Sequence, residues 1–311
     1  MKYSCLILII LFSIKCGFLL AQDPLTIISY NVENLFDCQH DTLKDDYSFL
    51  PDGTHYWTYY RYSTKLDRIA QVVVNISGWE SADLVGLCEV ENARCLRDLC
   101  YRLKRFHYNY VHYESADERG IDVALLYDST KVKVLDSEPL HVDLKGDNTR
   151  DVLYVKALIH SKDTIHAMVC HLPSRLGGGA ATKWKRVEAK RVIQQRIDSI
   201  LHEQSQAKIV IMGDMNDEAT NDLNGMSNQM IAFEQLGIGT HKYQGVWSCL
   251  DQFYVSNQLK DKVSIQIYSP EWLLEEDSKY MGNQPKRTFV GFRYHGGYSD
   301  HMPIVLTIYN K

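Results

Sequence analysis

Short apolar runs separated by polar turns fill the chain from residue 25 to residue 309 and predict a succession of buried strands. Segments such as LTIISYNV, DLVGLCEV and AKIVIMGD are almost continuously apolar and rich in β-branched residues, as is typical of strands covered on both faces. Others, such as YNYVHY, alternate like half-exposed strands. The predicted strands span residues 25–32, 83–90, 108–113, 121–128, 152–160, 164–172, 207–214, 250–256 and 302–309.

Three further segments carry apolar residues at helical spacing. The first helix is predicted from the stripe formed by Leu66, Ile69, Ala70, Val73 and Ile76, and Gly78 suits its end. The second spans residues 92–104 and the third residues 180–202. Because neighbouring strands often follow one another without a helix between them, we predict a layered α/β fold with mixed sheets, in one domain over residues 22–311.

The first residues resemble a secretory leader. Lys2 precedes the apolar run Leu6–Phe12, a second run ends at Ala21, and Lys15 interrupts the apolar stretch between them. A membrane span would need about 20 unbroken apolar residues, so cleavage near Ala21 and a secreted or periplasmic location are expected rather than an uncleaved anchor. Lipid attachment at Cys16 is the lesser alternative, because Ser13-Ile14-Lys15 lacks the small apolar residues of such a site.

The net charge limits how the chain could bind nucleic acids, and the cysteine spacing bears on possible disulfides. The net charge is −5 at pH 7, whereas a protein that binds duplex DNA mainly by charge is basic. Any nucleic-acid activity must therefore depend on local basic groups. The cysteines beyond the leader follow no framework spacing for so long a chain, and the sequence names no disulfide pair. We expect no stable membrane span and a monomer.

Polar residues repeatedly follow a predicted strand at the point where it ends. One such residue means little, because Asp and Asn often begin turns. A whole series is a pattern, since rigid scaffolds present functional groups at sheet ends. The residues concerned are Asn31, Glu33, Glu89, Glu91, His171, Asp214, Asn216, Asp251, Asp300 and His301.

The residue types in this series favour a hard cation. Carboxylate and amide oxygens suit Mg²⁺, with Mn²⁺ or Ca²⁺ as alternatives, and the paired Cys or His spacing of a zinc site is missing from the sequence. A hard cation together with acids and histidines is suited to phosphate-ester cleavage. The metal ion neutralises phosphoryl oxygens, a carboxylate positions and deprotonates water, and an imidazole stabilises developing charge.

Seven motifs in order resemble those of the endonuclease/exonuclease/phosphatase family, which includes deoxyribonuclease-I-like nucleases. They are YNVENLFD, LCEVEN, ERGIDVALLYD, CHLPSR, IMGDMND, SCLDQFYVS and YSDHMPI. Each motif alone is weak, but together they extend over nearly the whole predicted mature chain, as far as residue 304. The resemblance implies an α/β fold, a four-layered sandwich of two mixed β-sheets packed face to face with helices on the outside.

The resemblance also implies roles for individual residues. The metal ion would be held by Asn31, Glu89 and Asp300. Asp214 and Asn216 of GDMN would orient the attacking water and the phosphate, with Asp214 as the favoured base. Turn formation is the plainer reading of these last two residues, and the resemblance outweighs it.

Further roles follow from the same comparison. His301 would contact the scissile phosphate, and Asp251 would fix its tautomer. His171 matches the family's nucleases, although a buried core histidine is the plainer alternative. Arg150 occupies the place of a phosphate-contacting arginine. LPSRLGGGAATKWKR departs from the nucleases; its glycines would let the backbone approach an anion, and Arg175 could bind a phosphate.

Two clusters have plainer readings that the sequence favours. The basic residues of the third helix more often form a solvated face than a nucleic-acid platform. The aromatic cluster in residues 57–62 is better explained by packing than by base stacking.

Three functions remain open: a Mg²⁺-dependent nuclease of low sequence specificity, which we favour, an inositol-phosphate phosphatase or sphingomyelinase-like phospholipase, and a binding protein that has lost catalysis. The partner would be nucleic acid or another phosphodiester.

Overall fold

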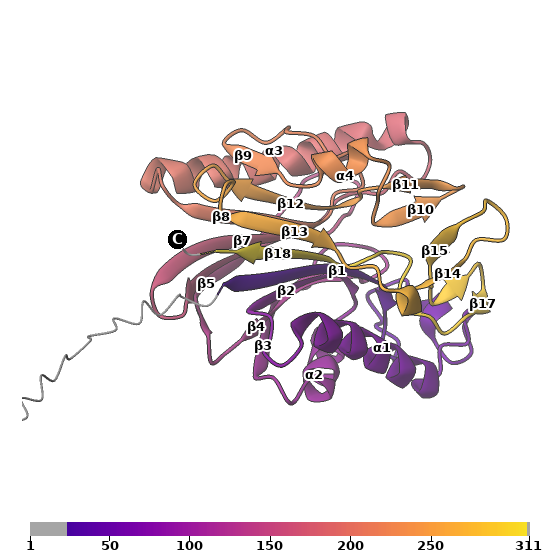
Figure 1. Ribbon diagram of the computed structural model, residues 1–311. Coiled ribbons are helices and arrows are strands. Elements are labelled where there is room, and N and C mark those ends of the chain that lie inside the picture. Colours follow the sequence, from indigo (N-terminus) through magenta and orange to yellow (C-terminus); the bar gives the residue numbers. More distant parts are fainter. Residues whose placement is uncertain (1–23, 310–311) are drawn as a thin grey trace, which may run out of the picture.

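The computed structural model describes residues 24–309 of the chain (Figure 1). The predicted leader, residues 1–21 with its cleavage site at Ala21 and the alternative lipid site at Cys16, lies outside the described residues. Within residues 24–309, none of the helices has the length and apolar character needed to cross a membrane. The six cysteines in the same range are all free.

The first large sheet has six strands and combines parallel with antiparallel pairs. Its order is β13 (Val263–Ile267), β18 (Ile304–Ile308), β1 (Leu25–Leu35), β2 (Leu84–Val90), β4 (Asp122–Asp128) and β3 (Tyr108–His112). Only the central pair, β1 and β2, is parallel. The carboxyl ends of these two strands therefore lie side by side at one edge of the sheet.

The second large sheet repeats this plan. Its order is β5 (Val132–Leu140), β6 (Val152–Ile159), β7 (Asp163–His171), β8 (Lys208–Asp214), β12 (Asp251–Ser256) and β9 (Met226–Asn228). Here the parallel pair is β7 and β8, again at the centre of the sheet. Strands β1 and β2 contact β7 and β8 across the interface between the sheets.

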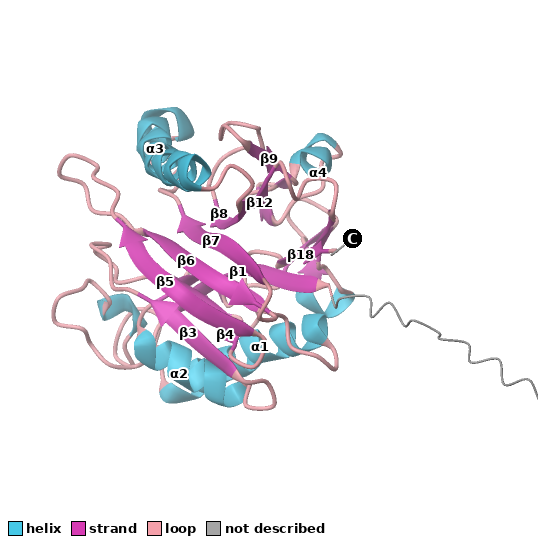
Figure 2. Cartoon of the chain, turned by 90° about the vertical axis from the view of Figure 1, so that its left-hand side faces the viewer, coloured by secondary structure: helices cyan, strands magenta, loops and turns pink. Residues whose placement is uncertain are grey.

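Helices cover the outer faces of the two sheets, so the molecule has four layers (Figures 1 and 2). Helices α1 (Tyr59–Ser77) and α2 (Ala93–Arg102) cover the first sheet. Helix α3 (Gly179–Glu203) and the short α4 (Ile231–Gln235) lie on the side of the second. The predicted four-layered α/β sandwich with two mixed sheets is confirmed.

Apolar side chains of both sheets fill the space between them, which explains the continuous apolar runs in the sequence. A second apolar cluster packs α3 against the outer face of the second sheet through Ala189, Ile193, Ile197 and Ile200. Between β7 and β8 the backbones approach closely, because a Cβ at Gly213 would lie 1.9 Å from the carbonyl oxygen of Cys170. Gly213 has φ of 132°, which a residue with a side chain rarely adopts.

Three small antiparallel hairpins extend the sandwich at the end where the functional residues gather. They are formed by β10 (His241–Tyr243) with β11 (Val246–Ser248), β14 (Leu274–Glu276) with β15 (Asn283–Pro285), and β16 (Phe289–Val290) with β17 (Arg293–Tyr294). Two single 3₁₀ turns cover Tyr47–Phe49 and Glu271–Leu273. Figure 1 shows β10, β11, β14 and β15 beyond the right-hand ends of the two sheets.

The basic residues of α3 are largely neutralised by acidic partners. Lys185 pairs with Asp147, Lys190 with Asp217 and Asp222, Arg191 with Glu188, and Arg196 with Glu138. Arg186 is not on the exposed face at all: it is buried and donates to the carbonyl oxygen of Gly179. This pattern agrees with a solvated, paired face.

Candidate active site

The parallel strand pairs of the two sheets bring four of the predicted functional residues together. Asn31 and Glu89 lie near the carboxyl ends of β1 and β2, and His171 and Asp214 are the last residues of β7 and β8. In the ladders, Asn31 is opposite Cys88 and His171 is opposite Asp214. Because the sheets pack face to face with these ends on the same side, the four side chains meet.

Asn31 connects the two carboxylates of this group. Its amide nitrogen donates to Asp214 Oδ2 at 3.1 Å and lies 3.4 Å from Glu89 Oε1. Glu89 has φ of 67°, and the ladder between β2 and β4 shifts register beside it. Such left-handed, bulged backbone is unfavourable for a residue with a side chain and concentrates at functional sites. The bulge turns the Glu89 carboxylate toward Asn31.

Asp251, His301 and Asp214 form the second part of the site. His301 Nδ1 lies 2.7 Å from Asp251 Oδ2, and its Nε2 lies 3.8 Å from Asp214 Oδ2. Asp251 begins β12 directly opposite Asp214 in the ladder, which explains how one imidazole reaches both carboxylates. All three residues are buried.

The pKa values of this group follow from burial and mutual charge. Burial alone would lower the pKa of His301, but the carboxylates of Asp251 and Asp214 raise it well above its ordinary value. Burial raises the pKa of Asp214 to about 6, an effect that the charge of His301 opposes. At neutral pH the site therefore holds an imidazolium between carboxylates, which suits stabilisation of negative charge on a phosphate.

His171 adds a neutral imidazole near the same carboxylate oxygen of Asp214 that His301 approaches. Its Nε2 lies 3.6 Å from Asp214 Oδ2 and 3.8 Å from Glu89 Oε1. Burial, followed by the charge of Arg150, lowers the pKa of His171 well below its ordinary value. The structure thus places His171 against the acidic residues of the site and not in an apolar core.

Asn216 approaches the centre from the loop after β8. Its backbone N–H donates to Asp214 Oδ1 at 2.9 Å, and its side-chain nitrogen donates to the carbonyl oxygen of Leu172 at 3.0 Å. Its φ of 49° is left-handed, a conformation that asparagine tolerates better than most residues. These bonds fix the amide beside Asp214, where the sequence places it.

Asp300 lies on the far side of His301 from Asp251. Its carboxylate accepts from Arg287 Nη2 at 2.8 Å and lies 4.0 Å from His301 Nε2. Burial would raise its pKa, but the charges of His301, His241 and Arg287 lower it. The structure brings Asn31 and Glu89 into contact, whereas within residues 24–309 no hydrogen bond or ion pair joins the Asp300 side chain to either of them. Asp300 approaches His301, which in turn lies near Asp214. A common ligand set of Asn31, Glu89 and Asp300 remains a prediction.

Glu33, the other acid at the end of β1, supports the site from behind. Its carboxylate accepts from the backbone N–H groups of Thr288 and Phe289 at 2.6 and 3.2 Å. The buried Lys65 donates to the Thr288 hydroxyl and to the carbonyl oxygen of Tyr298. Glu33 and Lys65 together therefore hold the segment that leads to Asp300.

The two arginines predicted to contact phosphate have different surroundings. Arg150 is buried, and its guanidinium donates to Asp117 and to the carbonyl oxygens of His171 and Leu172. It supports the backbone that carries His171, and a direct contact with phosphate remains a prediction. Arg175 donates to the carbonyl oxygen of Asn216 at 2.9 Å and is partly exposed. Its position beside Asn216 suits a contact with substrate.

Two residues near the site, His241 and Arg119, were not predicted from the sequence. The ring of His241 lies 4.8 Å from that of His301, and its Nε2 is 4.0 Å from Asp300. Arg119 is half-exposed, lies 3.7 Å from Asp117, and its charge contributes to lowering the pKa of His171. His241 belongs to a three-residue strand and Arg119 to a loop. Neither follows an apolar run, so the pattern that revealed the other residues could not reveal these two.

Replacing Arg119 by alanine should weaken catalysis without weakening the fold. The half-exposed guanidinium of Arg119 acts on the charge of His171, and we expect it to donate a hydrogen bond to a phosphoryl oxygen of the substrate. Because a hydrogen bond to a charged group contributes about 1.5–3 kcal/mol, kcat/KM should fall about tenfold to a hundredfold. Arg150→Ala should instead lower the free energy of unfolding by about 3 kcal/mol, because the buried Asp117 carboxylate loses its close partner and keeps only the more distant Arg119. Steady-state kinetics and urea unfolding of both variants would test this. A loss of stability in Arg119→Ala, or a loss of kcat/KM without a loss of stability in Arg150→Ala, would contradict these roles.

Glu91 lies two residues beyond Glu89 but faces away from the centre. Its carboxylate accepts from the backbone N–H of Asp37 at 2.6 Å and lies near Cys95. Burial, with the neighbouring charge of Asp37, raises the pKa of Glu91 to about 8. Of the two acids at the end of β2, only Glu89 belongs to the site.

This environment predicts a pH-dependent effect of Glu91→Gln. A carboxyl whose pKa is raised on folding contributes stability below its unfolded pKa, and that contribution is lost as pH rises from about 4.5 to about 8. The amide of the glutamine variant carries no charge at any pH and does not lose this stability, so the variant should gain about 3 kcal/mol relative to wild type between pH 5 and pH 8. Urea unfolding at both values measures it, with exposed Glu203→Gln as control. An equal effect of Glu91→Gln at both pH values would refute the assignment.

The donor set fits a hard divalent cation. Glu89 and Asp214 present carboxylate oxygens beside the amide of Asn31, and within residues 24–309 no lysine or arginine forms an ion pair with either acid. Two adjacent carboxylates without a basic partner are the arrangement that Mg²⁺ or Mn²⁺ satisfies. His241, Asp300 and His301 also bring ligand atoms within 4.8 Å of one another.

Fold and site together define a phosphoesterase, an enzyme that hydrolyses phosphate esters with the help of a metal ion. More specifically, residues 26–310 match the model of the Endonuclease/Exonuclease/phosphatase family, and the chain belongs to this family. No protein among curated sequences matches the chain significantly.

Several solved structures share the fold at low sequence identity. Truncated TDP2 from Caenorhabditis elegans is 18% identical, with a TM-score of 0.61 over 92% of this chain and 98% of that one. An endonuclease/exonuclease/phosphatase family protein from Bacteroides thetaiotaomicron is 16% identical, with a TM-score of 0.57 over 93% and 100%. The human Nocturnin catalytic domain, solved with a bound sulfate anion, is 14% identical, with a TM-score of 0.57 over 91% and 93%.

Proposed function

We propose that this protein is a Mg²⁺-dependent nuclease of low sequence specificity that hydrolyses phosphodiester bonds by in-line attack of water. The observation that carries the proposal is the imidazole of His301 between Asp251 and Asp214, 2.7 and 3.8 Å from their oxygens, beside the Asn31–Glu89 pair. An acid, a base and a set of oxygen donors within one buried cluster meet the requirements of phosphodiester hydrolysis.

The side chains have distinct tasks in this proposal. Asp214 accepts the proton of the attacking water. Its carboxylate lies near the imidazoles of His171 and His301, and a hydrogen bond from Asn31 fixes its position. His301 donates a hydrogen bond to a phosphoryl oxygen, and Asp251 keeps the imidazole charged and oriented. Asn31, Glu89 and Asp300 would hold the metal ion. When bound, that ion would neutralise the phosphoryl oxygens and lower the pKa of water.

The chain would act outside the cytoplasm if the leader is cleaved near Ala21. The acidic balance of the chain is compatible with a nuclease that binds its substrate through the few arginines near the site and not through a broad basic surface. Sequencing the amino terminus of the protein recovered from the culture medium or the periplasm tests the location. A protein that starts at Met1 and remains with the cells would contradict it.

A substrate panel tests the reaction. The purified protein is incubated with plasmid DNA, single-stranded DNA, RNA, inositol phosphates and sphingomyelin vesicles in Mg²⁺, with and without EDTA. Nucleic-acid cleavage that disappears with EDTA and in His301→Asn supports the nuclease, and the variant excludes a contaminating enzyme. Release of phosphate or phosphocholine with intact nucleic acids would favour the phosphatase or phospholipase. An inert protein that still binds a phosphate ester would indicate a binding function.

A further inference from the structure

A hollow of about 750 Å³ lies directly beside the catalytic cluster. Loop 174–178, before α3, forms one wall, and the β10–β11 hairpin forms the other. Asn216 and His241 line its inner end, so the hollow opens from the site itself. Its volume falls within the range of roughly 300–1,000 Å³ that is usual for small-molecule pockets.

The walls combine exposed apolar side chains with a polar inner edge. Leu176 is 88% exposed and Val246 is 65% exposed, on opposite walls. Exposed apolar side chains that line an open hollow lose their contact with water when a ligand enters. Arg175 and Asn216 supply hydrogen-bonding groups at the end nearest the site.

The glycine run that departs from the nucleases is part of this wall. Gly177 and Gly178 have φ of 86° and 110°, a region that side chains disfavour. A Cβ at Gly177 would meet no atom within 4 Å, so close packing does not explain this glycine. The two glycines add no side chain to this wall, and the neighbouring Leu176 stays exposed along the hollow.

We propose that the hollow binds the nucleoside attached to one side of the scissile phosphate. A nucleobase has apolar faces, which Leu176 and Val246 would cover, and a polar edge, which Arg175 and Asn216 would contact. Because a base must leave a duplex stack to enter such a hollow, single strands and chain ends are the preferred substrates. This inference rests on the proposed function, since it assigns one subsite of the same active centre.

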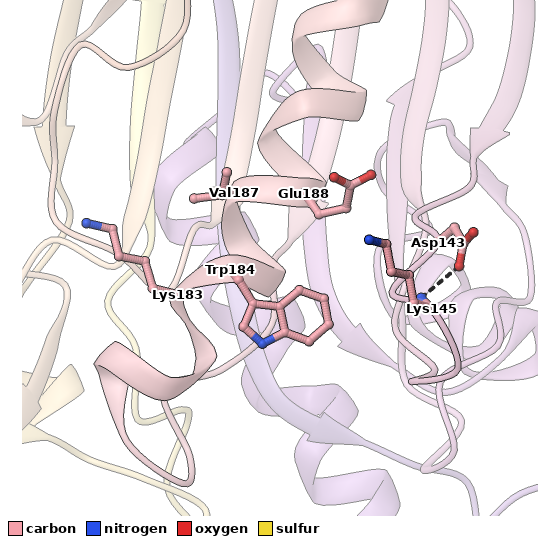
Figure 3. Close-up of a pocket in the computed structure, with 6 residues that line it drawn as sticks. All are labelled: Asp143, Lys145, Lys183, Trp184, Val187 and Glu188. Atoms are coloured by element: carbon pink, nitrogen blue, oxygen red, sulfur yellow. Dashed lines mark hydrogen bonds between the residues drawn. The ribbon is translucent and has the colours of Figure 1, made fainter.

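A second hollow serves as the internal control. It has a volume of about 470 Å³ and is lined by Lys145, Lys183, Trp184, Val187 and neighbouring acids (Figure 3). Val187 is 56% exposed, much like Val246. In the described part of the chain, no hydrogen bond or ion pair joins the residues of Figure 3 to the catalytic cluster. A change at Val187 therefore alters an exposed valine without altering the proposed subsite.

The test compares substrates that differ only in the group beside the phosphate. These are the 5′- and 3′-(p-nitrophenyl phosphate) esters of thymidine and methyl p-nitrophenyl phosphate, assayed with Mg²⁺. For wild type we expect one thymidine ester to exceed the methyl ester in kcat/KM by about tenfold or more, because covering a base removes apolar surface from water. Leu176→Ser with Val246→Ser should reduce that preference to about threefold or less. Val187→Ser should preserve it.

Binding of thymidine 5′-monophosphate, measured by calorimetry in the same proteins, distinguishes failure of the nucleoside subsite from failure of the proposed nuclease function. Equal kcat/KM for thymidine and methyl esters in wild type, or a preference unchanged by the double substitution, overturns the subsite. Hydrolysis of no diester by wild type, with nucleotide binding that Leu176→Ser and Val246→Ser abolish, overturns the proposed function and retains the subsite. A preference for long-chain alkyl esters over thymidine esters would assign the hollow to a lipid tail and overturn the nucleoside.

Discussion

Asp214→Asn should lower kcat for phosphodiester hydrolysis by about 10³-fold or more and leave the protein folded. Among the residues that the structure describes, Asp214 is the only carboxylate joined to Asn31, His171 and His301 at once. Asparagine has nearly the same shape but cannot accept a proton from water. Since burial already raises the pKa of the Asp214 carboxyl to about 6, removing its charge also removes a desolvation cost, and the melting temperature should change little.

The kinetics would be measured in Mg²⁺ with bis(p-nitrophenyl) phosphate, and folding by circular dichroism. Asp222→Asn is the matched control, because Asp222 lies in the same loop after β8 but its carboxylate accepts from Lys190 and Tyr254, which are not part of the catalytic cluster. A variant Asp214→Asn that keeps more than about a tenth of the wild-type kcat would assign the base to another residue.

The central strands could be predicted from the sequence because buried strands are rich in apolar residues. Strands β1, β2, β7 and β8 are covered on both faces, so nearly every position is buried and each strand contains a run rich in apolar residues. Strands β5 and β13, which were not predicted, lie at sheet edges and pair on one side only. Most of their residues are exposed or half-buried, and β5 also contains Pro139. Edge strands lack the apolar signal that burial imposes.

The site was predictable wherever a functional residue ends a central strand. Asn31, Glu89, His171 and Asp214 converge because each follows an apolar run and because two parallel pairs align their ends. The orientation of side chains was not predictable. Glu89 is the penultimate residue of β2 and Glu91 directly follows the strand, and a backbone bulge with left-handed φ at Glu89 separates their directions. Such a bulge depends on tertiary packing and leaves no mark in the sequence.

Asp251→Asn should lower kcat by about 10²–10⁴-fold through its effect on His301. Asp251 is fully buried, and its Oδ2 lies 2.7 Å from His301 Nδ1. An amide in its place can still accept a hydrogen bond, but it supplies no negative charge. Although burial lowers the pKa of His301, the carboxylates of Asp251 and Asp214 raise it above its ordinary value, and the substitution removes the larger of these two charge effects. The imidazole should then be neutral at pH 7.

Two measurements distinguish this positioning role from a merely structural one. Nuclear magnetic resonance of the His301 ring across pH should show a protonated imidazole at pH 7 in wild type and a neutral one in Asp251→Asn. Because Asp251 acts through His301, the double variant with His301→Asn should be no slower than His301→Asn alone. If the two losses multiplied, or if the pKa of His301 stayed high in Asp251→Asn, the pair would not act as a unit. The raised pKa of His301 would then be due to Asp214 and Asp300, the remaining carboxylates near its Nε2.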